Sequence, residues 1–150
     1  MITNPVVFRQ RVPIGLVSLA QATLPSLIAG GLLTLESGRH FTTAADFTDT
    51  GNLTLGPGST FRVIGNYLQG PTGTLEVQLG DVPASGQFGQ LVVDNQATLN
   101  GTLQIDLVNG YPGNPGDTFT IVTFGTRSGD FTTLNLAGGT WNPDDGTVSF

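Results

Sequence analysis

His40 is the only histidine of this chain and the first side chain whose type could serve catalysis, because imidazole exchanges a proton near neutral pH. A catalytic histidine needs a partner that orients its ring, and the nearest carboxylates in sequence belong to Asp46 and Asp49. In the repeat described below, His40 aligns with Thr60, one residue before a phenylalanine of the predicted core. We therefore expect His40 to point outward, as a surface histidine.

A serine nucleophile finds no support in the spacing of the residues. The chain contains no Gly-x-Ser-x-Gly turn, which would hold such a serine at the tip of a sharp elbow. Ser37 stands just before Gly38, Arg39 and His40, but adjacent residues of a strand face opposite ways. The sequence therefore predicts no serine triad.

Two carboxylates, Glu76 and Asp106, could act as the acid and the base of a glycosidase or polysaccharide lyase. Both point outward in the predicted strands, with Glu76 aligned to Gln104 and Asp106 offset by two residues. Pectin-lyase-like β-helices are the enzyme precedent, and their sites also need calcium-binding carboxylates and a basic residue. This chain has no lysine, and its five basic residues are scattered: Arg9, Arg11, Arg39, Arg62 and Arg127. We expect no catalytic residue, and a polysaccharide-cleaving or polysaccharide-binding β-helix is the alternative.

Residues 142–146 (Asn-Pro-Asp-Asp-Gly) offer carboxylates and carbonyls that could hold a calcium ion. They lack the alternating ligand spacing and the distal glutamate of a calcium-binding loop, so we interpret them as a type I turn. The chain has no cysteine, which excludes disulfides and thiolate metal sites. We expect neither a bound metal nor a cofactor.

Exposed threonines and aromatic residues are the remaining candidates for binding. Threonines recur at matching outward positions or beside them: Thr34, Thr54, Thr74 and Thr102. A flat threonine ladder could bind ice or a polysaccharide, but threonine is also a common residue of solvated strands. Three aromatic residues could stack on sugar rings: Tyr67, Tyr111 and Trp141. Of these, Tyr67 aligns with Phe47 and is expected in the core.

A repeat of about 20 residues organises the elements that must position these side chains. Residues 31–41 match residues 51–61, which sets the repeat length. Residues 73–77 and 101–105 repeat the opening pattern Gly-x-Leu-x-(Leu/Val/Ile), at the longer spacings of 22 and 28 residues that loop insertions would cause. An imperfect period of this length is typical of solenoids.

Within each copy, apolar and polar residues alternate, as in residues 74–79 and 102–107, which predicts strands with one buried face. Stacking the copies as parallel coils brings like residues together, whereas an antiparallel meander gives no reason for the likeness. The expected pairs are Leu33 with Leu53, Phe41 with Phe61, and Phe47 with Tyr67. We therefore predict an all-β fold, a right-handed parallel β-solenoid with a C-terminal β cap.

We expect one domain over residues 1–150, with repeat coils at 31–111 and a hairpin-like cap or closing coil at 112–150. The cap is expected to contain strands at 117–124, 130–136 and 147–150. An apolar edge on the last of these strands is expected to lie uncovered, so that the chain could form homo-oligomers or assemble end to end.

Residues 1–30 are expected to form an N-terminal coil or cap, and two hypotheses stay open for their first part. Arg9 and Arg11 precede an apolar stretch, and residues 20–22 (Ala-Gln-Ala) resemble a signal-peptidase site. Against this, residues 16–24 agree with residues 91–99 at six of nine positions, which favours a structural first coil.

The composition excludes several classes of protein. Glycine supplies 22 of 150 residues and only 11% are charged, so solvated helices are hard to build. A net charge of −6 disfavours nucleic acids and anionic membrane surfaces as partners. No apolar run approaches the length of about 20 residues that spans a bilayer.

The Gly-x-Leu-x-Val coils, the segment Pro-Gly-Asp-Thr-Phe-Thr-Ile-Val-Thr-Phe at 115–124 and Ser-Gly-Asp-Phe at 128–131 resemble the β-helical passenger segments of autotransporter-type and haemagglutinin-like bacterial surface proteins. The resemblance covers roughly residues 31–136. It implies a non-enzymatic stalk or adhesin, extracellular or on the cell surface. Adhesion to a polysaccharide or another surface ligand would need exposed aromatics or long loops, and the insertions at 80–90 and 109–117 are where we expect them.

Overall fold

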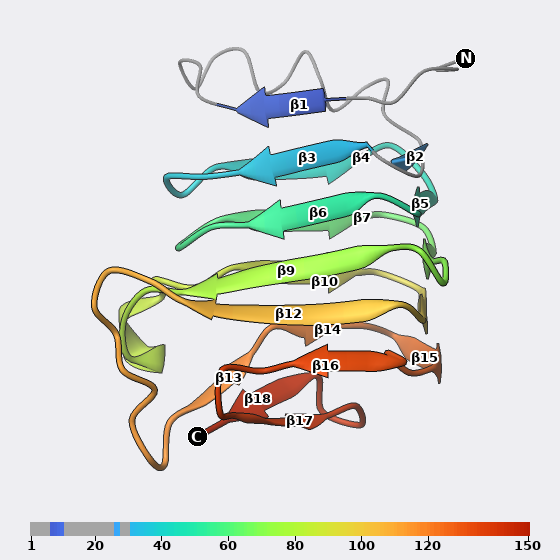
Figure 1. Ribbon diagram of the computed structural model, residues 1–150. Helices are drawn as coiled ribbons and strands as arrows, with labels where there is room; N and C mark the ends of the chain where they lie inside the picture. The colour runs from blue at the N-terminus through green and yellow to red at the C-terminus, as the bar shows by residue number, and fades with distance from the viewer. Residues whose placement is uncertain (1–6, 11–25, 28–30) are drawn as a thin grey trace.

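Three parallel sheets run along the molecule in the computed structural model, which describes residues 7–10, 26–27 and 31–150 (Figure 1). Sheet A contains β1 (Val7–Gln10), β3 (Leu32–Leu35), β6 (Asn52–Leu55), β9 (Thr74–Leu79), β12 (Thr102–Leu107) and β16 (Thr133–Asn135). Sheet B contains β2 (Ser26–Leu27), β5 (Phe47–Asp49), β8 (Tyr67–Gln69), β11 (Gln96–Leu99) and β15 (Thr126–Gly129). Sheet C contains β4 (His40–Thr43), β7 (Thr60–Val63), β10 (Gln90–Val93) and β14 (Val122–Thr123).

Successive strands visit sheets A, C and B in turn, as β3, β4 and β5 do and as β6, β7 and β8 do again. Each set of three strands therefore makes one coil, and each coil lies parallel to the next. In β9 the side chains alternate between partly exposed and buried along all six residues. An all-β chain built of stacked parallel strands is consistent with the predicted β-solenoid.

The register of the coils confirms the pairs expected from the repeat. Leu33 lies opposite Leu53, Phe41 opposite Phe61, and Phe47 opposite Tyr67. All six of these side chains are fully buried. The Phe41 and Phe61 rings stack with their centres 5.3 Å apart, and those of Phe47 and Tyr67 stack at 6.3 Å. Like residues therefore form columns inside the coils, which explains why the copies resemble one another.

The glycines that open the third and fourth copies, Gly73 and Gly101, are required by the close approach of successive coils. A Cβ atom on Gly73 would lie 2.3 Å from the Asp49 carbonyl oxygen, and one on Gly101 would lie 2.2 Å from the Gly73 carbonyl oxygen. Gly101 also has a φ of +65°, which L side chains rarely adopt. The corner that leads into sheet A thus leaves no room for a side chain.

The C-terminal third divides between the parallel sheets and a small antiparallel sheet. Strands β14, β15 and β16 continue sheets C, B and A in parallel. Sheet D is antiparallel and contains β13 (Thr118–Thr120), β18 (Thr147–Ser149) and β17 (Thr140–Asn142), in that order. Figure 1 shows sheet D beyond the last strands of the parallel sheets.

Two expectations for this region are wrong. The strand predicted at 117–124 is split, because β13 pairs with β18 whereas β14 pairs with β10. The last strand has no uncovered edge, because β18 lies between β13 and β17 of its own chain. The backbone of Phe150 also bonds to Gly116 and Asp117. Alternation predicts that a segment is a strand, but it does not identify the neighbour that the strand will choose.

The two hypotheses for the first residues rest on positions 16–24, which lie outside the described residues. Among the described residues, no helix is both long and apolar enough to cross a lipid bilayer. A short helical turn, η2 (Pro83–Ser85), lies in the insertion between β9 and β10.

Candidate functional site

The outer face of sheet A carries most of the convergent polar side chains of the described region. Outward residues of β9 and β12 meet there in register, with Gln104 opposite Glu76 and Asp106 opposite Gln78. On the other side of β9, Thr54 of β6 lies opposite Glu76. The alternation of the strands therefore places the two carboxyls predicted from the sequence side by side on one solvated face.

Glu76 and Asp106 are close enough to share a hydrogen bond, which is the principal reason that the pKa of Glu76 is raised to about 7. Partial burial of Glu76 and the charge of Asp106 raise the pKa further. Hydrogen bonds from Thr54 and Asn52 oppose this rise, and the Thr54 hydroxyl donates to Glu76 Oε1 at 3.2 Å. Gln104 Nε2 donates to Asp106 Oδ1 at 2.9 Å. Glu76 therefore exchanges its proton near neutral pH.

This arrangement differs from that of a glycoside hydrolase. Two catalytic carboxyls stand about 5–5.5 Å apart in retaining enzymes and about 6.5–9.5 Å apart in inverting ones, so that a glycosidic bond fits between them. The carboxyls of Glu76 and Asp106 instead contact each other. Their register neighbours are Thr54, Gln104 and Gln78, none of which supplies a positive charge. The pair can exchange a proton and accept hydrogen bonds.

The structure places His40 at the surface, as expected. It lies on β4 opposite Thr60 and is exposed. Its two sequence neighbours with carboxylates are engaged elsewhere, since Asp46 Oδ1 accepts from the Asn66 backbone at 2.8 Å and Asp49 is fully buried. Ser37 lies in a turn with a φ of +58°. These side chains do not converge.

Asp49 belongs to a buried polar cluster that the sequence analysis missed. Gln69 Nε2 donates to the carbonyls of Asn100, Thr102 and Gly73 at 2.7, 3.0 and 3.2 Å. The Gln69 carbonyl oxygen therefore faces the Tyr67 hydroxyl, which donates to it at 2.7 Å.

A hydroxyl group has only one proton, so Tyr67 cannot also donate to Asp49, whose Oδ2 lies 3.2 Å from the hydroxyl oxygen. We infer that Asp49 is protonated and donates to Tyr67. Burial, the largest cause, raises the pKa of Asp49 to about 8, and the hydrogen bonds that Tyr67 and Gly51 can donate to its ionised form lower the pKa in part. Burial likewise raises the pKa of Tyr67 well above its usual range. The only sequence signal was an aspartate at a core position of the repeat.

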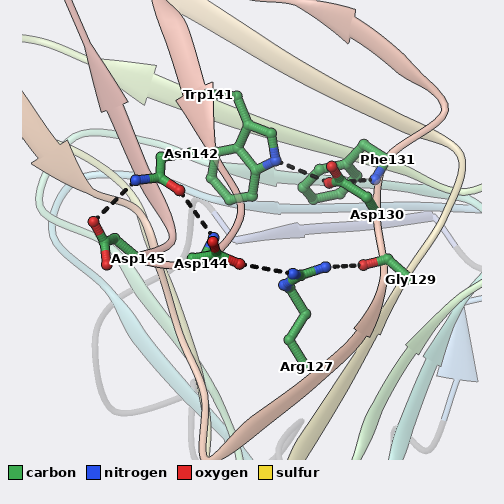
Figure 2. Close-up of polar contacts among 8 residues, drawn as sticks. All are labelled: Arg127, Gly129, Asp130, Phe131, Trp141, Asn142, Asp144 and Asp145. Atoms are coloured by element: carbon green, nitrogen blue, oxygen red, sulfur yellow. Dashed lines mark hydrogen bonds and ion pairs between the residues drawn. The ribbon is translucent and has the colours of Figure 1, made fainter.

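A second polar network joins sheet D to the last parallel coil (Figure 2). Arg127 of β15 donates to Asp144 Oδ1 at 3.0 Å and to the carbonyl of Gly129. Trp141 of β17 donates its indole N–H to Asp130 Oδ1 at 2.9 Å. Its ring meets that of Phe131 edge to face at 5.3 Å. The network fixes the hairpin of β17 and β18 against the chain that leaves β15.

The aromatic residues considered for sugar stacking are not available for it. Trp141 is 8% exposed and Tyr67 is fully buried. Tyr111 is 6% exposed, and its hydroxyl donates to Asp117 Oδ2 at 2.7 Å. Among the other aromatic side chains that the structure describes, Phe88, Phe124 and Phe150 are partly buried and the rest are buried.

Residues 142–146 form a turn, closed by a hydrogen bond from the Gly146 backbone to the Asn142 carbonyl at 2.9 Å. Their carboxylates have partners within the chain, because Asp144 contacts Arg127 and Asp145 accepts from Asn142 at 3.0 Å (Figure 2). In the part of the chain that the structure describes, no three acidic, histidine or cysteine side chains gather as metal ligands would.

The threonines do not form one ladder. Thr34 lies opposite Thr54, but the next residue of that column is Glu76. Thr74 and Thr102 lie in a different column, which also contains Leu32 and Asn52. The register follows the opening glycines of the copies, with Leu53 opposite Leu75 and Leu75 opposite Leu103. The two pairs of threonines therefore stand at positions of the repeat that differ by two residues.

A polar hollow lies at one edge of sheet A, with a volume of about 480 Å³. Its lining comes from the turns that follow β3 and β6 and from the ends of β9 and β12 with their loops: Glu36, Ser37, Gly38, Pro57, Gln78, Gln87, Val108 and Asn109. Gln87 and Asn109 belong to the insertions named from the sequence as places for adhesive loops. Residue types alone did not indicate that these insertions would meet.

Comparison of the chain with protein-family models, with curated proteins and with solved structures found no match. The function must therefore be inferred from the fold and from the chemistry of its surfaces.

Proposed function

We propose that this chain is a non-enzymatic β-solenoid module, a structural or adhesive element that serves as a stalk or scaffold of a larger extracellular or cell-surface assembly. The observation that carries the proposal is the column of leucines that runs through sheet A: Leu33, Leu53, Leu75 and Leu103. Each coil packs a leucine against the equivalent leucine of the next coil, so that added coils lengthen the molecule along one axis. Such a body acts through its length and its outer faces.

The distribution of ionisable groups supports the absence of catalysis in this proposal. Glu76 and Asp106 contact each other, Arg62 pairs with Asp94 at 2.9 Å, and Arg127 pairs with Asp144. The two ion pairs neutralise their own charges, and the like-charged Glu76 and Asp106 lie at a separate place. A hydrolase or lyase needs an acid, a base and a means of stabilising charge around one bond.

Right-handed winding and a capping role for sheet D are further parts of the proposal. Parallel strands of one sheet are joined by right-handed crossovers in nearly all proteins. Sheet D buries Phe119, Val148 and Trp141 in the same core that the coils form. An antiparallel sheet at this position would cover backbone that a further coil would otherwise pair with.

The proposal is tested by a screen for polysaccharide cleavage combined with a glycan-binding array. We expect no turnover, together with saturable binding if the module is adhesive and no binding if it is a stalk. Cleavage that is lost in the variant Glu76→Gln or His40→Ala would overturn the proposal.

A polysaccharide-cleaving β-helix is the second candidate, and the pKa of Glu76 favours it. A carboxyl with a pKa of about 7 suits a general acid at neutral pH. The contact between the two carboxyls speaks against it. The variant Asp106→Asn separates the two candidates, because an enzyme loses turnover with this change whereas a scaffold keeps its binding and its fold.

A further inference from the structure

The polar hollow lies where the strands of sheet A end. The arrowheads of β3, β6, β9 and β12 point to one edge of the sheet, at the left in Figure 1, and the two long insertions leave the sheet there. On the outer face of sheet A at this edge, Gly56 lies between Glu36 and Gln78 and has no side chain of its own. A Cβ atom on Gly56 would lie 3.3 Å from Glu36 Cα and 3.4 Å from Gln78 Oε1. The glycine therefore leaves a gap between Glu36 and Gln78, with Pro57 beside it.

The two insertions complete the walls of the hollow. Gln87 lies over Gly58, where a Cβ atom would be 3.7 Å from its Nε2. Asn109 lies over Gly80, where a Cβ atom would be 2.9 Å from its Nδ2. Glycines thus permit these carboxamides to approach the coils closely. The resulting volume of about 480 Å³ lies within the range of about 300–1,000 Å³ that is typical of small-ligand sites.

The carboxamides of the hollow have unused hydrogen-bonding capacity. The side chains of Gln78, Gln87 and Asn109 make no hydrogen bond to any other described residue. Each carboxamide offers two donors and one acceptor. The lining adds one carboxylate, from Glu36, and no basic side chain, and its apolar surface comes from Pro57 and Val108.

We propose that the hollow lined by Gln78, Gln87 and Asn109 binds one ring of a neutral saccharide. Neighbouring hydroxyls of a sugar each donate and accept, which matches carboxamides that do the same. The C–H face of the ring packs on Pro57 and Val108, while Glu36 and the net charge of −6 disfavour an anionic sugar. This inference rests on the adhesive form of the proposed function.

Binding is measured by isothermal titration calorimetry and by amide chemical shifts of the full chain, with cellohexaose, chitohexaose and maltohexaose as neutral probes. Hexagalacturonate is the anionic probe. We expect saturable binding of at least one neutral probe, with shifts at Gln78, Gln87 and Asn109, and weaker binding of hexagalacturonate.

The variants Gln78→Ala and Gln87→Ala are each expected to weaken binding roughly three- to tenfold, the effect of losing one net hydrogen bond. Gln96→Ala is the matched control, because Gln96 is an exposed glutamine on β11 of sheet B and lies outside the hollow. It is expected to leave binding unchanged. Amide spectra that match those of the parent show that each variant is folded.

The inference is overturned if no neutral probe binds, if hexagalacturonate binds as tightly as the best neutral probe, or if Gln78→Ala and Gln87→Ala both bind like the parent. These results leave the proposed function intact as a stalk. Turnover of any probe overturns the proposed function instead, and the two failures are thereby distinguished.

Discussion

At the scale of single residues, Asp49 is the most unusual group, because it is an acid whose side chain is fully buried. It lies in register between Leu27 and Gln69, and Gln69 lies on the same inward side. A neutral carboxylic acid can donate to Tyr67, and an ionised one cannot. Burial raises the pKa of Asp49 to about 8, so that the carboxyl is mostly protonated at neutral pH.

The raised pKa predicts how stability depends on pH. The pKa of Asp49 is about 8 in the folded protein and near 3.8 when the chain is unfolded, so between these values the folded state holds a proton that the unfolded state has lost. The free energy of unfolding falls as pH rises through this window, by at most about 1.4 kcal/mol per pH unit, and levels off above it. Urea titrations from pH 4 to pH 9 measure the slope.

The isosteric variant Asp49→Asn serves as the control for that slope. Its Nδ2 can donate to Tyr67 and its Oδ1 can accept from Gly51, so the cluster stays intact without an ionisable group. We expect a flatter pH profile and higher stability than the parent at pH 8. A parent profile that rises between pH 5 and pH 8 would contradict the protonated state.

Ionisation of Glu76, on the outer face of sheet A, is also expected to lower the free energy of unfolding as pH rises. Its pKa is raised to about 7, so that its contribution is present at acidic pH and is lost as pH rises through about 7. Glu76→Gln keeps an acceptor for Thr54 and gains a donor toward Asp106, which removes the repulsion between two carboxylates. We expect this variant to gain stability over the parent at pH 8 and to match it near pH 5, as measured by thermal unfolding.

At the scale of elements, the inner columns of sheet A hold the coils together. Leu53 is fully buried between Leu33 and Leu75 on the neighbouring coils. Leu53→Ala is expected to lower the free energy of unfolding by about 2–5 kcal/mol, the usual range for a buried leucine. Leu68→Ala is the matched control, since Leu68 is 45% exposed on β8, and it should change stability by less than about 0.5 kcal/mol. Equal effects in urea denaturation would contradict the assigned core.

Sheet D contains the only tryptophan of the chain, so that fluorescence reports on this element alone. The sheet shares its core with the coils through Phe119 and Val148. We expect the Trp141 fluorescence and the far-ultraviolet circular dichroism to change at the same denaturant concentration. Separate transitions would show that sheet D folds independently of the coils.

The polar links of sheet D are expected to differ in strength. Trp141→Phe removes the hydrogen bond to Asp130 and retains the ring packing on Phe131, which should cost about 1–2 kcal/mol. Asp144→Ala removes an ion pair in which Asp144 is 82% exposed, so its effect should stay below about 1 kcal/mol. A larger loss with Asp144→Ala than with Trp141→Phe in denaturant titrations would reverse this assignment.

At the scale of the whole molecule, each coil is stabilised by its neighbours. Strands β6, β9 and β12 pair on both sides within sheet A, whereas β16 pairs on one side only and all three of its residues are exposed. We expect the slowest amide hydrogen exchange in β6 and β9 and fast exchange in β16. Uniform protection across sheet A would contradict a gradient of stability along the stack.

The sequence by itself determined the strands and their stacking. Apolar and polar residues alternate within each copy, and the copies repeat about every 20 residues. This pattern predicts parallel stacking of the copies, in which Leu33 lies opposite Leu53 and Phe41 opposite Phe61. It also predicted the outward positions of His40, Glu76 and Asp106. These features are local or repeat along the chain, and a repeat shows directly which residues lie side by side.

Only the tertiary structure decided the neighbours of residues that do not repeat. The chain on either side of Ile121 joins different sheets, and β18 pairs within its own chain rather than with another molecule. The protonation of Asp49 depends on the orientation of the Gln69 carboxamide. That orientation is set by three backbone carbonyls, which belong to two other segments of the chain. The polar hollow depends on two insertions that meet at one edge of sheet A. Such contacts follow from the path of the whole backbone, because no periodicity in the sequence encodes them.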